Sequence, residues 1–256
     1  MTIDRATPGS TRSDGSSFDP SGLTVYADGE YVDGADATVS LWDHGFLYGD
    51  GIFEGMRLFD GSLFRPRDHL ARLERSARSI GLELPLGEEE LLDVICEVIV
   101  RSGLTDAHVR PIVTRGFGTP GVDPARCERS SLFVAAYPFP PLLGSDPIRV
   151  LVSSVVRKSP RSVGAHVKSL NYLDAVLAKR QATAAGMHEA IMLDHLGAVA
   201  ECSAANLFLE KGQNYKNHPS LPEKGAESKL KVPVALALNA VELSHLPCMR
   251  QPVQPR

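Results

Sequence analysis

The stretch HVKSLNY, residues 166–172, contains the lysine on which the interpretation of this 256-residue chain depends. No lysine precedes Lys158, although the same region is rich in arginine. Lys168 follows an apolar stretch and precedes a helix expected from about Leu170 to Ala185. An amine here suits nucleophilic chemistry, because burial readily neutralises a lysine whereas arginine stays charged. The stretch therefore indicates a Schiff-base lysine, with a solvated lysine at a helix start as the alternative.

Glu201 lies downstream among small residues, in the stretch VAECSAANLF at 199–208. If Lys168 carries a pyridine cofactor, a carboxylate can keep the ring nitrogen protonated and so preserve the ring's capacity as an electron sink. Without Lys168, Glu201 reads as an ordinary turn acid.

Composition excludes several classes of protein. With 43% apolar residues, the chain can form one large domain or two modest ones. A net charge of −4 and the lack of an apolar run near about 20 residues argue against nucleic-acid and membrane partners. The four cysteines and eight histidines show no metal-ligand spacing, so we expect free thiols, a cytoplasmic location and no metal site.

Composition and turn residues divide the chain into five segments. We expect a disordered tail at 1–22, a small α+β domain at 23–137, a proline-rich linker at 138–147, part of a larger domain at 148–211 and a divergent tail at 212–256. The expected elements are hairpins at 23–32 and 57–64, helices at 66–80 and 88–101, and strands at 108–114, 131–137, from 148, at 190–193 and at 206–210.

Two stretches of the first half indicate a ligand site. In WDHGFLYGDGIFEG, residues 42–55, four glycines let the backbone approach a ligand, and Tyr48 and Phe53 can line a pocket; an ordinary tight turn before a strand is the alternative. Arg72 lies at the edge of the apolar face of its helix. It can hold a phosphate with a bidentate fork, or belong to a solvated outer face.

Arg110 occurs in the apolar strand AHVRPIVTRG, residues 107–116. It shares a face with Thr114, whereas Arg115 points to the other face. An arginine in such a strand must be paired or face a cleft, so its partner is either a substrate carboxylate or an internal carboxylate.

Together and in this order, the motifs resemble the class IV pyridoxal-phosphate-dependent aminotransferases, most closely the branched-chain amino-acid aminotransferases. The resemblance runs from about Val25 to Glu210. It rests on the segments DHG at 43–45, YGDG at 48–51, FEG at 53–55, RL at 72–73, KSLNY at 168–172, EC at 201–202 and NLF at 206–208. It implies a two-domain α+β and α/β enzyme of fold type IV, like D-amino-acid aminotransferase, with an incomplete C-terminal domain.

The resemblance also implies roles for single residues. Lys168 would bind pyridoxal 5'-phosphate covalently and move the proton, Glu201 would face the pyridine nitrogen, Arg72 the phosphate and Tyr172 the phenolic oxygen. Asn206 would belong to the same cofactor-binding group.

The substrate pocket follows from the same resemblance. Tyr48, Phe53 and Arg57 would line it, and Arg110 would receive the distal carboxylate of glutamate or 2-oxoglutarate. The ligands would be amino acids and 2-oxo acids. Such proteins are usually homodimers, so we expect a homodimer or higher homo-oligomer with part of the pocket supplied by the neighbour.

The C-terminal stretch departs from the family pattern. Residues 211–256 hold five lysines and two arginines, against three and seventeen before them. The Gly-Ile-Thr-Arg helix start that binds phosphate in the family, and a later Gly-Thr turn for the substrate α-carboxylate, have no counterpart. We therefore expect impaired cofactor affinity and turnover.

Four functions remain open from the sequence. The leading one is transamination of branched-chain or similar amino acids with 2-oxoglutarate, which FEGMR at 53–57 and VRP at 109–111 favour. The others are an aminodeoxychorismate lyase, a D-amino-acid transaminase, and an inactive scaffold or interaction protein. The exact amino donor stays open, since one methylene changes discrimination by only about 1–3 kcal/mol.

Overall fold

The computed structural model describes residues 18–139, 147–164, 166–211, 214–217 and 246–247. Most of the tail expected at 1–22, of the linker expected at 138–147 and of the divergent tail expected at 212–256 lies outside the described residues.

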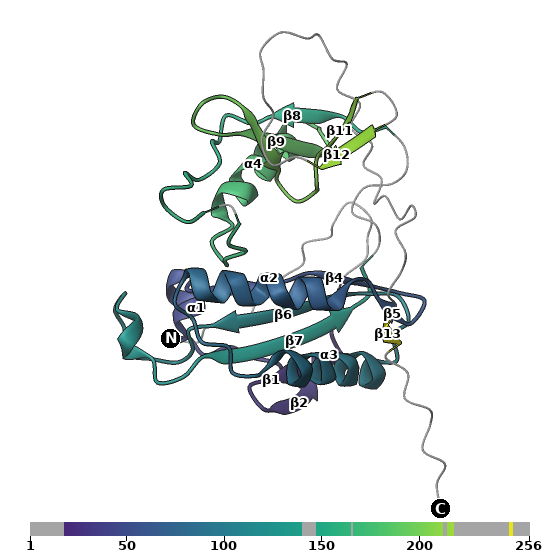
Figure 1. The fold of residues 1–256 in the computed structure, drawn as a ribbon, viewed down its shortest axis with the longest axis vertical. Helices are drawn as coiled ribbons and strands as arrows, with labels where there is room; N and C mark the ends of the chain where they lie inside the picture. The colour runs from purple at the N-terminus through teal and green to yellow at the C-terminus, as the bar shows by residue number, and fades with distance from the viewer. Residues whose placement is uncertain (1–17, 140–146, 165, 212–213, 218–245, 248–256) are drawn as a thin grey trace, which may run out of the picture.

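The larger of the two main units is an antiparallel sheet of eight strands (Figure 1). Its order is β13-β5-β4-β6-β7-β1-β2, and β3 pairs with β6 beside this path. The strands are β1 (Thr24–Ala27), β2 (Glu30–Asp33), β3 (Gly51–Phe53), β4 (Met56–Phe59), β5 (Ser62–Leu63), β6 (Ala107–Thr114), β7 (Ser131–Tyr137) and β13 (Leu246–Pro247). The unit also contains α1 (His44–Tyr48), α2 (Pro66–Ser79), α3 (Glu88–Ser102) and a 3₁₀ turn at Pro124–Arg126.

The smaller unit lies above the larger one in Figure 1. In it, β9 (Glu189–Leu193) pairs in parallel with β8 (Val150–Val152) and antiparallel with β10 (Val199–Cys202). Helix α4 (Leu173–Ala184) packs against β9 and β8. A separate pair is formed by β11 (Phe208–Lys211) and β12 (Asn214–Asn217).

The two long helices of the larger unit confirm the sequence prediction to within one residue. Pro66 occupies the start of α2, where its fixed φ is compatible with the helix. Glu90 returns its side chain to the backbone N–H of Gly87 at 2.9 Å and so caps α3. Gly103, with φ 64°, ends that helix in the left-handed conformation that glycine adopts without strain.

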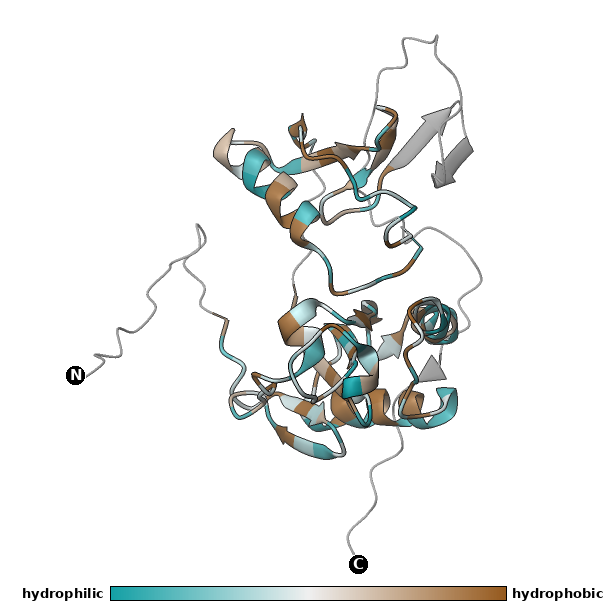
Figure 2. Cartoon of the chain, turned by 90° about the vertical axis from the view of Figure 1, so that its left-hand side faces the viewer, coloured by the Kyte–Doolittle hydropathy of each residue, from teal (hydrophilic) through white to brown (hydrophobic). Residues whose placement is uncertain are grey.

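Strand alternation gives the larger sheet two different faces. Val109 and Val113 of β6, with Ile52 and Met56 of the neighbouring strands, are completely buried and belong to one apolar core with residues of α2 and α3. Figure 2 shows hydrophobic residues of this unit, in brown, gathered on its strands and on the helices packed against them. The intervening residues of β6 lie on the opposite face, because successive side chains alternate. His108 and Arg110 are therefore kept out of the core.

The segment before α4 is the main departure from the prediction. The helix begins at Leu173, and residues 168–170 instead extend along β3. The backbone N–H of Phe53 donates to Lys168 O at 3.0 Å, and that of Leu170 donates to Gly51 O at 2.9 Å. The prediction of a helix from Leu170 is wrong, because the backbone groups of residues 168–170 form hydrogen bonds with the free edge of β3 instead of with a helical turn.

The sequence prediction also omits several short elements, among them α1, β3 and β10. The glycine-rich stretch contains α1, whose N-cap Asp43 accepts a hydrogen bond from Gly45 N at 2.7 Å. Gly49, with φ 71°, closes the helix. This Asp and Gly spacing is a helix signal that the interpretation as a tight turn overlooks. Strand β10 is also omitted, and it contains Glu201.

Candidate active site

Lys168 lies where its extended segment meets the edge of β3. Its backbone N–H donates to Ser76 Oγ of α2 at 3.2 Å. Its Nζ donates to Tyr172 Oη at 3.1 Å and lies 4.5 Å from the ring centroid of Phe53. The rings of Phe53 and Tyr172 meet edge to face, with centroids 5.1 Å apart. The structure thus brings three predicted site residues together around one amine.

Arg110 and His108 continue this cluster on the same face of β6. The guanidinium carbon of Arg110 lies 4.9 Å from the Phe53 ring centroid, and Nη2 lies 3.4 Å from His108 Nε2. Burial lowers the pKa of His108 to about 4, helped by the positive charges of Arg110, Arg57 and Lys168. Histidine is therefore neutral here near pH 7, and the surrounding charge is positive.

One donor of Arg110 has no partner among the described residues. Its Nε is buried and makes no hydrogen bond to any described residue. Such a donor normally costs about 1–3 kcal/mol unless something binds it. Together with the positive charges nearby, this open donor favours a bound anion such as a carboxylate.

Arg57 lies at the border of the cluster. Its Nη1 donates to Phe139 O at 2.7 Å, and Nη2 lies 4.0 Å from Asp106 Oδ1. Arg57 also faces His108 across the β4–β6 pair. The predicted pocket residue is thus opposite His108, and its described polar contacts are to a backbone carbonyl and to a partly exposed carboxylate.

Arg72 is paired with a buried carboxylate that the sequence interpretation overlooks. Glu54 Oε1 accepts from Arg72 Nε at 2.5 Å and Oε2 from Nη2 at 2.7 Å. His69 Nδ1 lies 2.9 Å from the same Oε2. Burial acts to raise the pKa of Glu54, but the hydrogen bonds and charges of Arg72 and His69 outweigh it and lower the pKa to about 2.

Glu201 has Arg157 as its partner. Arg157 Nε donates to Glu201 Oε1, and its Nη1 donates to Asp174 Oδ2 at 2.5 Å. The Arg157 side chain is only 11% exposed, whereas that of Glu201 is 45% exposed. A carboxylate has about four acceptor positions, so Glu201 can also face a protonated ring nitrogen. Asn206 is exposed, and no hydrogen bond of its side chain is described.

Tyr48 is placed apart from these contacts. Its Oη accepts a hydrogen bond from Gly121 N at 2.7 Å, and its ring packs edge-on against His44 with centroids 5.0 Å apart. Among the described residues, neither contact involves Lys168, Arg72 or Arg110. Tyr48 belongs instead to an exposed aromatic surface around α1, which also includes Trp42, Phe46 and Phe117.

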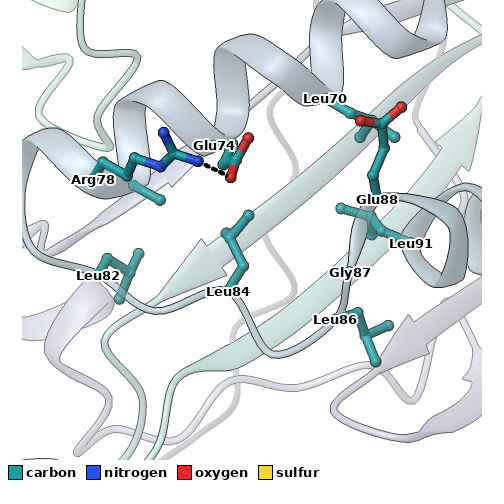
Figure 3. Close-up of a pocket in the computed structure, with 10 residues that line it drawn as sticks. Leu70, Glu74, Arg78, Leu82, Leu84, Leu86, Gly87, Glu88 and Leu91 are labelled. Carbon is teal, nitrogen blue, oxygen red and sulfur yellow. Dashed lines mark hydrogen bonds and ion pairs between the residues drawn. The ribbon is translucent and has the colours of Figure 1, made fainter.

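A separate hollow of 390 Å³ lies between α2, the following loop and α3 (Figure 3). It is lined mainly by leucines, and an ion pair between Arg78 and Glu74 lies at its border. It shares no residue with the cluster around Lys168, so we do not assign it to the chemistry.

The described side chains suit a phosphorylated pyridine aldehyde. They include an amine beside a phenol, an arginine with part of its fork open, and a carboxylate on β10.

Among the described residues, no group of three or more histidine, cysteine, aspartate or glutamate side chains is arranged to hold a metal. No helix in that part of the chain is long and apolar enough to cross a membrane.

Comparisons with known proteins agree with these features. The family described as "Amino-transferase class IV" matches residues 51–215. A "Putative branched-chain-amino-acid aminotransferase" of Methanocaldococcus jannaschii is 46% identical over 197 residues, which cover 77% of this chain and 68% of that protein. The "Branched-chain-amino-acid aminotransferase" of Salmonella typhimurium is 33% identical over 193 residues, covering 72% of this chain and 62% of that protein.

A solved structure shows the same fold. A branched-chain amino acid aminotransferase from T.th., complexed with N-(5'-phosphopyridoxyl)-L-glutamate, matches with a TM-score of 0.71 and 31% identity, covering 77% of this chain and 67% of that one. The chain thus spans about two thirds of the length of the proteins it matches. From the family match and the shared fold together, this chain belongs to the class IV aminotransferases, a pyridoxal-phosphate-dependent family of fold type IV.

Proposed function

We propose that this chain catalyses the pyridoxal-phosphate-dependent transamination of branched-chain or similar hydrophobic L-amino acids with 2-oxoglutarate. The observation that carries the proposal is the position of Lys168 Nζ, within hydrogen-bond distance of Tyr172 Oη and beside Phe53. The names of the two curated relatives support the choice of branched-chain substrates.

The side chains of the cluster have distinct tasks in this proposal. The cofactor, when bound, supplies an electron sink for the charge that develops at the substrate α-carbon. Lys168 Nζ would take the proton from that carbon and deliver it to the cofactor, because an amine is a suitable general base. Tyr172 Oη accepts a hydrogen bond from Nζ and so orients it. Glu201 holds a proton at the ring nitrogen, and Arg72 binds the phosphate.

Arg110 is proposed as the residue that recognises the second carboxylate of glutamate or 2-oxoglutarate. Its buried Nε lacks a partner among the described residues, and its guanidinium packs on Phe53, next to Lys168. Nη2 of Arg110 lies 3.4 Å from neutral His108. Among the described residues no carboxylate forms an ion pair with Arg110, so its guanidinium is left for the substrate. Phe53 and Arg57 would contact the substrate from the same sheet face.

We also propose a homodimer in which Tyr48 completes the pocket of the neighbouring copy. The support is the exposed aromatic surface around α1, where Phe46 is 66% and Phe117 63% exposed. An exposed apolar patch of this kind favours a protein interface. Sedimentation velocity would test the assembly, and a monomer at micromolar concentration would contradict it.

The domain organisation belongs to the proposal as well. Residues 23–137, which make up most of the larger unit described above, would correspond to the small domain of the family's complete enzymes, and 148–211 to part of their larger, cofactor-binding domain. Cofactor affinity would be weaker than in the relatives, because residues 212–256 lack the family's phosphate-binding helix start. Asn206 would contribute to the cofactor site from the loop before β11.

Spectra of the purified chain test the proposed reaction. Pyridoxal 5'-phosphate should produce the visible absorbance band of a lysine-bound cofactor. Leucine should remove the band, and 2-oxoglutarate should restore it with formation of glutamate. A response to D-alanine alone would favour a D-amino-acid transaminase, and pyruvate release from aminodeoxychorismate would favour the lyase. A spectrum that never changes would indicate the inactive scaffold.

A further inference from the structure

We propose that Glu54 is a positioning residue, which holds one edge of the Arg72 guanidinium so that the opposite edge is presented to the phosphate of the cofactor. The inference rests on the proposed function, because it takes Arg72 as the phosphate-binding arginine. It goes beyond the proposed function because it assigns a role to the Glu54 carboxylate, which binds Arg72 rather than the cofactor.

The hydrogen bonds between the two side chains occupy one edge of the fork. Nε and Nη2 of Arg72 donate to the two oxygens of Glu54 at 2.5 and 2.7 Å. This is the bidentate arrangement of an arginine and a carboxylate. Within the described residues, Nη1 makes no hydrogen bond. Its two N–H groups form the edge that remains for an anion.

The difference in burial shows that Glu54 is the fixed partner and that Arg72 is the partner accessible to a ligand. The Glu54 side chain is 0% exposed and that of Arg72 is 45% exposed. Glu54 is also tied to the sheet, because its backbone N–H donates to Pro111 O at 3.0 Å. A buried carboxylate requires a partner, so the sheet dictates the orientation of the guanidinium on α2.

His69 strengthens this anchor from the same helix. Its Nδ1 lies 2.9 Å from Glu54 Oε2 and must be the donor, because an ionised carboxylate only accepts. Although burial acts to raise it, the hydrogen bonds with Arg72 and His69 hold the pKa of Glu54 at about 2, so this carboxylate is ionised near neutral pH. Glu54 offsets part of the positive charge of Arg72, so it does not add to the attraction of the phosphate. Its contribution is to fix the orientation of the guanidinium.

A second arginine of the same unit shows what a purely structural pair looks like. Nε and Nη2 of Arg115 donate to Oδ2 and Oδ1 of Asp50 at 2.9 and 3.0 Å. Its second edge is also occupied, since Nη1 donates to Gly81 O at 2.6 Å and Nη2 to Ile80 O at 2.9 Å. Arg115 has no open edge, whereas Arg72 does. Asp50→Asn is therefore the matched control for Glu54→Gln.

The test compares the dissociation constants of pyridoxal 5'-phosphate and of pyridoxal, which lacks the phosphate. E54Q keeps the shape but replaces one acceptor with an amide N–H, so the edge of Arg72 is no longer fixed. We expect E54Q to weaken pyridoxal 5'-phosphate binding about tenfold or more, the size of one lost charge-assisted hydrogen bond, with little change for pyridoxal. D50N should leave the ratio of the two constants unchanged.

The outcomes separate the two proposals. An equal loss for both ligands in E54Q, or the same ratio in E54Q and D50N, would overturn the positioning role while leaving the proposed function in place. Failure of the unaltered chain to bind pyridoxal 5'-phosphate more tightly than pyridoxal would overturn both.

A measurement on the unaltered chain covers the case in which E54Q does not fold. Arginine ¹⁵N signals, with Arg72 identified by its loss in R72K, should show a shift of Nη1 and an unchanged Nε when pyridoxamine 5'-phosphate is added. A shift of Nε would mean that the fork leaves Glu54 for the phosphate, and the inference would be wrong.

Discussion

Replacing Arg110 with methionine tests the proposed recognition of dicarboxylates. The substitution keeps an unbranched side chain of similar length against Phe53 but removes every donor, including the buried Nε that has no partner among the described residues. A leucine substrate has no distal carboxylate and so never uses these donors. The two kinds of substrate should therefore respond differently.

The structure allows the size of this difference to be estimated. A hydrogen bond to a charged group contributes about 1.5–3 kcal/mol, which corresponds to roughly 10- to 150-fold in affinity. We expect R110M to raise KM for 2-oxoglutarate and glutamate within this range, and to change KM for leucine by less than about threefold. Removal of the positive charge should also bring the pKa of His108 closer to its ordinary value, because Arg110 is the largest charge that lowers it.

The assay measures both half-reactions separately by the absorbance of the bound cofactor. Arg115→Met is the matched control, because Arg115 directly follows β6 and both edges of its guanidinium donate to Asp50 and to two carbonyl groups. R115M should lower stability and leave the ratio of the two KM values unchanged. A parallel rise of KM for leucine and 2-oxoglutarate in R110M would refute the assignment of Arg110 to the distal carboxylate.

Three further predictions follow from the cluster and its neighbours. K168R should abolish the visible cofactor band and lower turnover by about 10²–10⁴-fold, as expected for loss of the proton-transferring base, and a variant that keeps the band would contradict the role of Lys168. The pKa of His108 in the folded chain, about 4, lies below its ordinary value of 6.5, so neutral His108 contributes its full stabilisation of the fold above pH 6.5 and loses it as the pH falls towards 4. Allowing for partial exposure, the free energy of unfolding in urea should fall by about 2 kcal/mol more over this pH range in the unaltered chain than in H108F. R157M should cost about 1–3 kcal/mol in urea unfolding at pH 7, because Asp174 and Glu201 lose a shared, 11% exposed partner while Asp174 keeps Lys158 at 4.0 Å. The double variant with D174N should recover part of this loss.

The chain's own periodicity and turn residues determine much of the fold. The apolar spacing of α2 and α3, with Pro66 at one start and Gly103 at one end, defines both helices to within a residue. These signals are local, since each depends on residues one or two turns apart. The chemistry is likewise indicated by short contiguous motifs, but only by those around Lys168, Arg72 and Glu201 taken together and in order.

Only the tertiary structure shows how the site is assembled. Glu54 reads as one acid of a glycine-rich stretch, yet it meets Arg72 and His69 once α2 packs beside β3. The helix expected from Leu170 starts three residues later, because the edge of β3 offers partners that a single segment cannot reveal.

The same limit applies to Arg157, which looks like an ordinary arginine after a short strand. It becomes the partner of Glu201 only because β9 and β10 bring residue 201 next to residue 157. The amino-acid sequence by itself therefore determined the two long helices and most of the longer strands, and it indicated Lys168 as the proposed reactive amine. The packing of distant segments decided which charges meet, because the free energy of a buried ion depends on partners that are neighbours in space rather than in sequence.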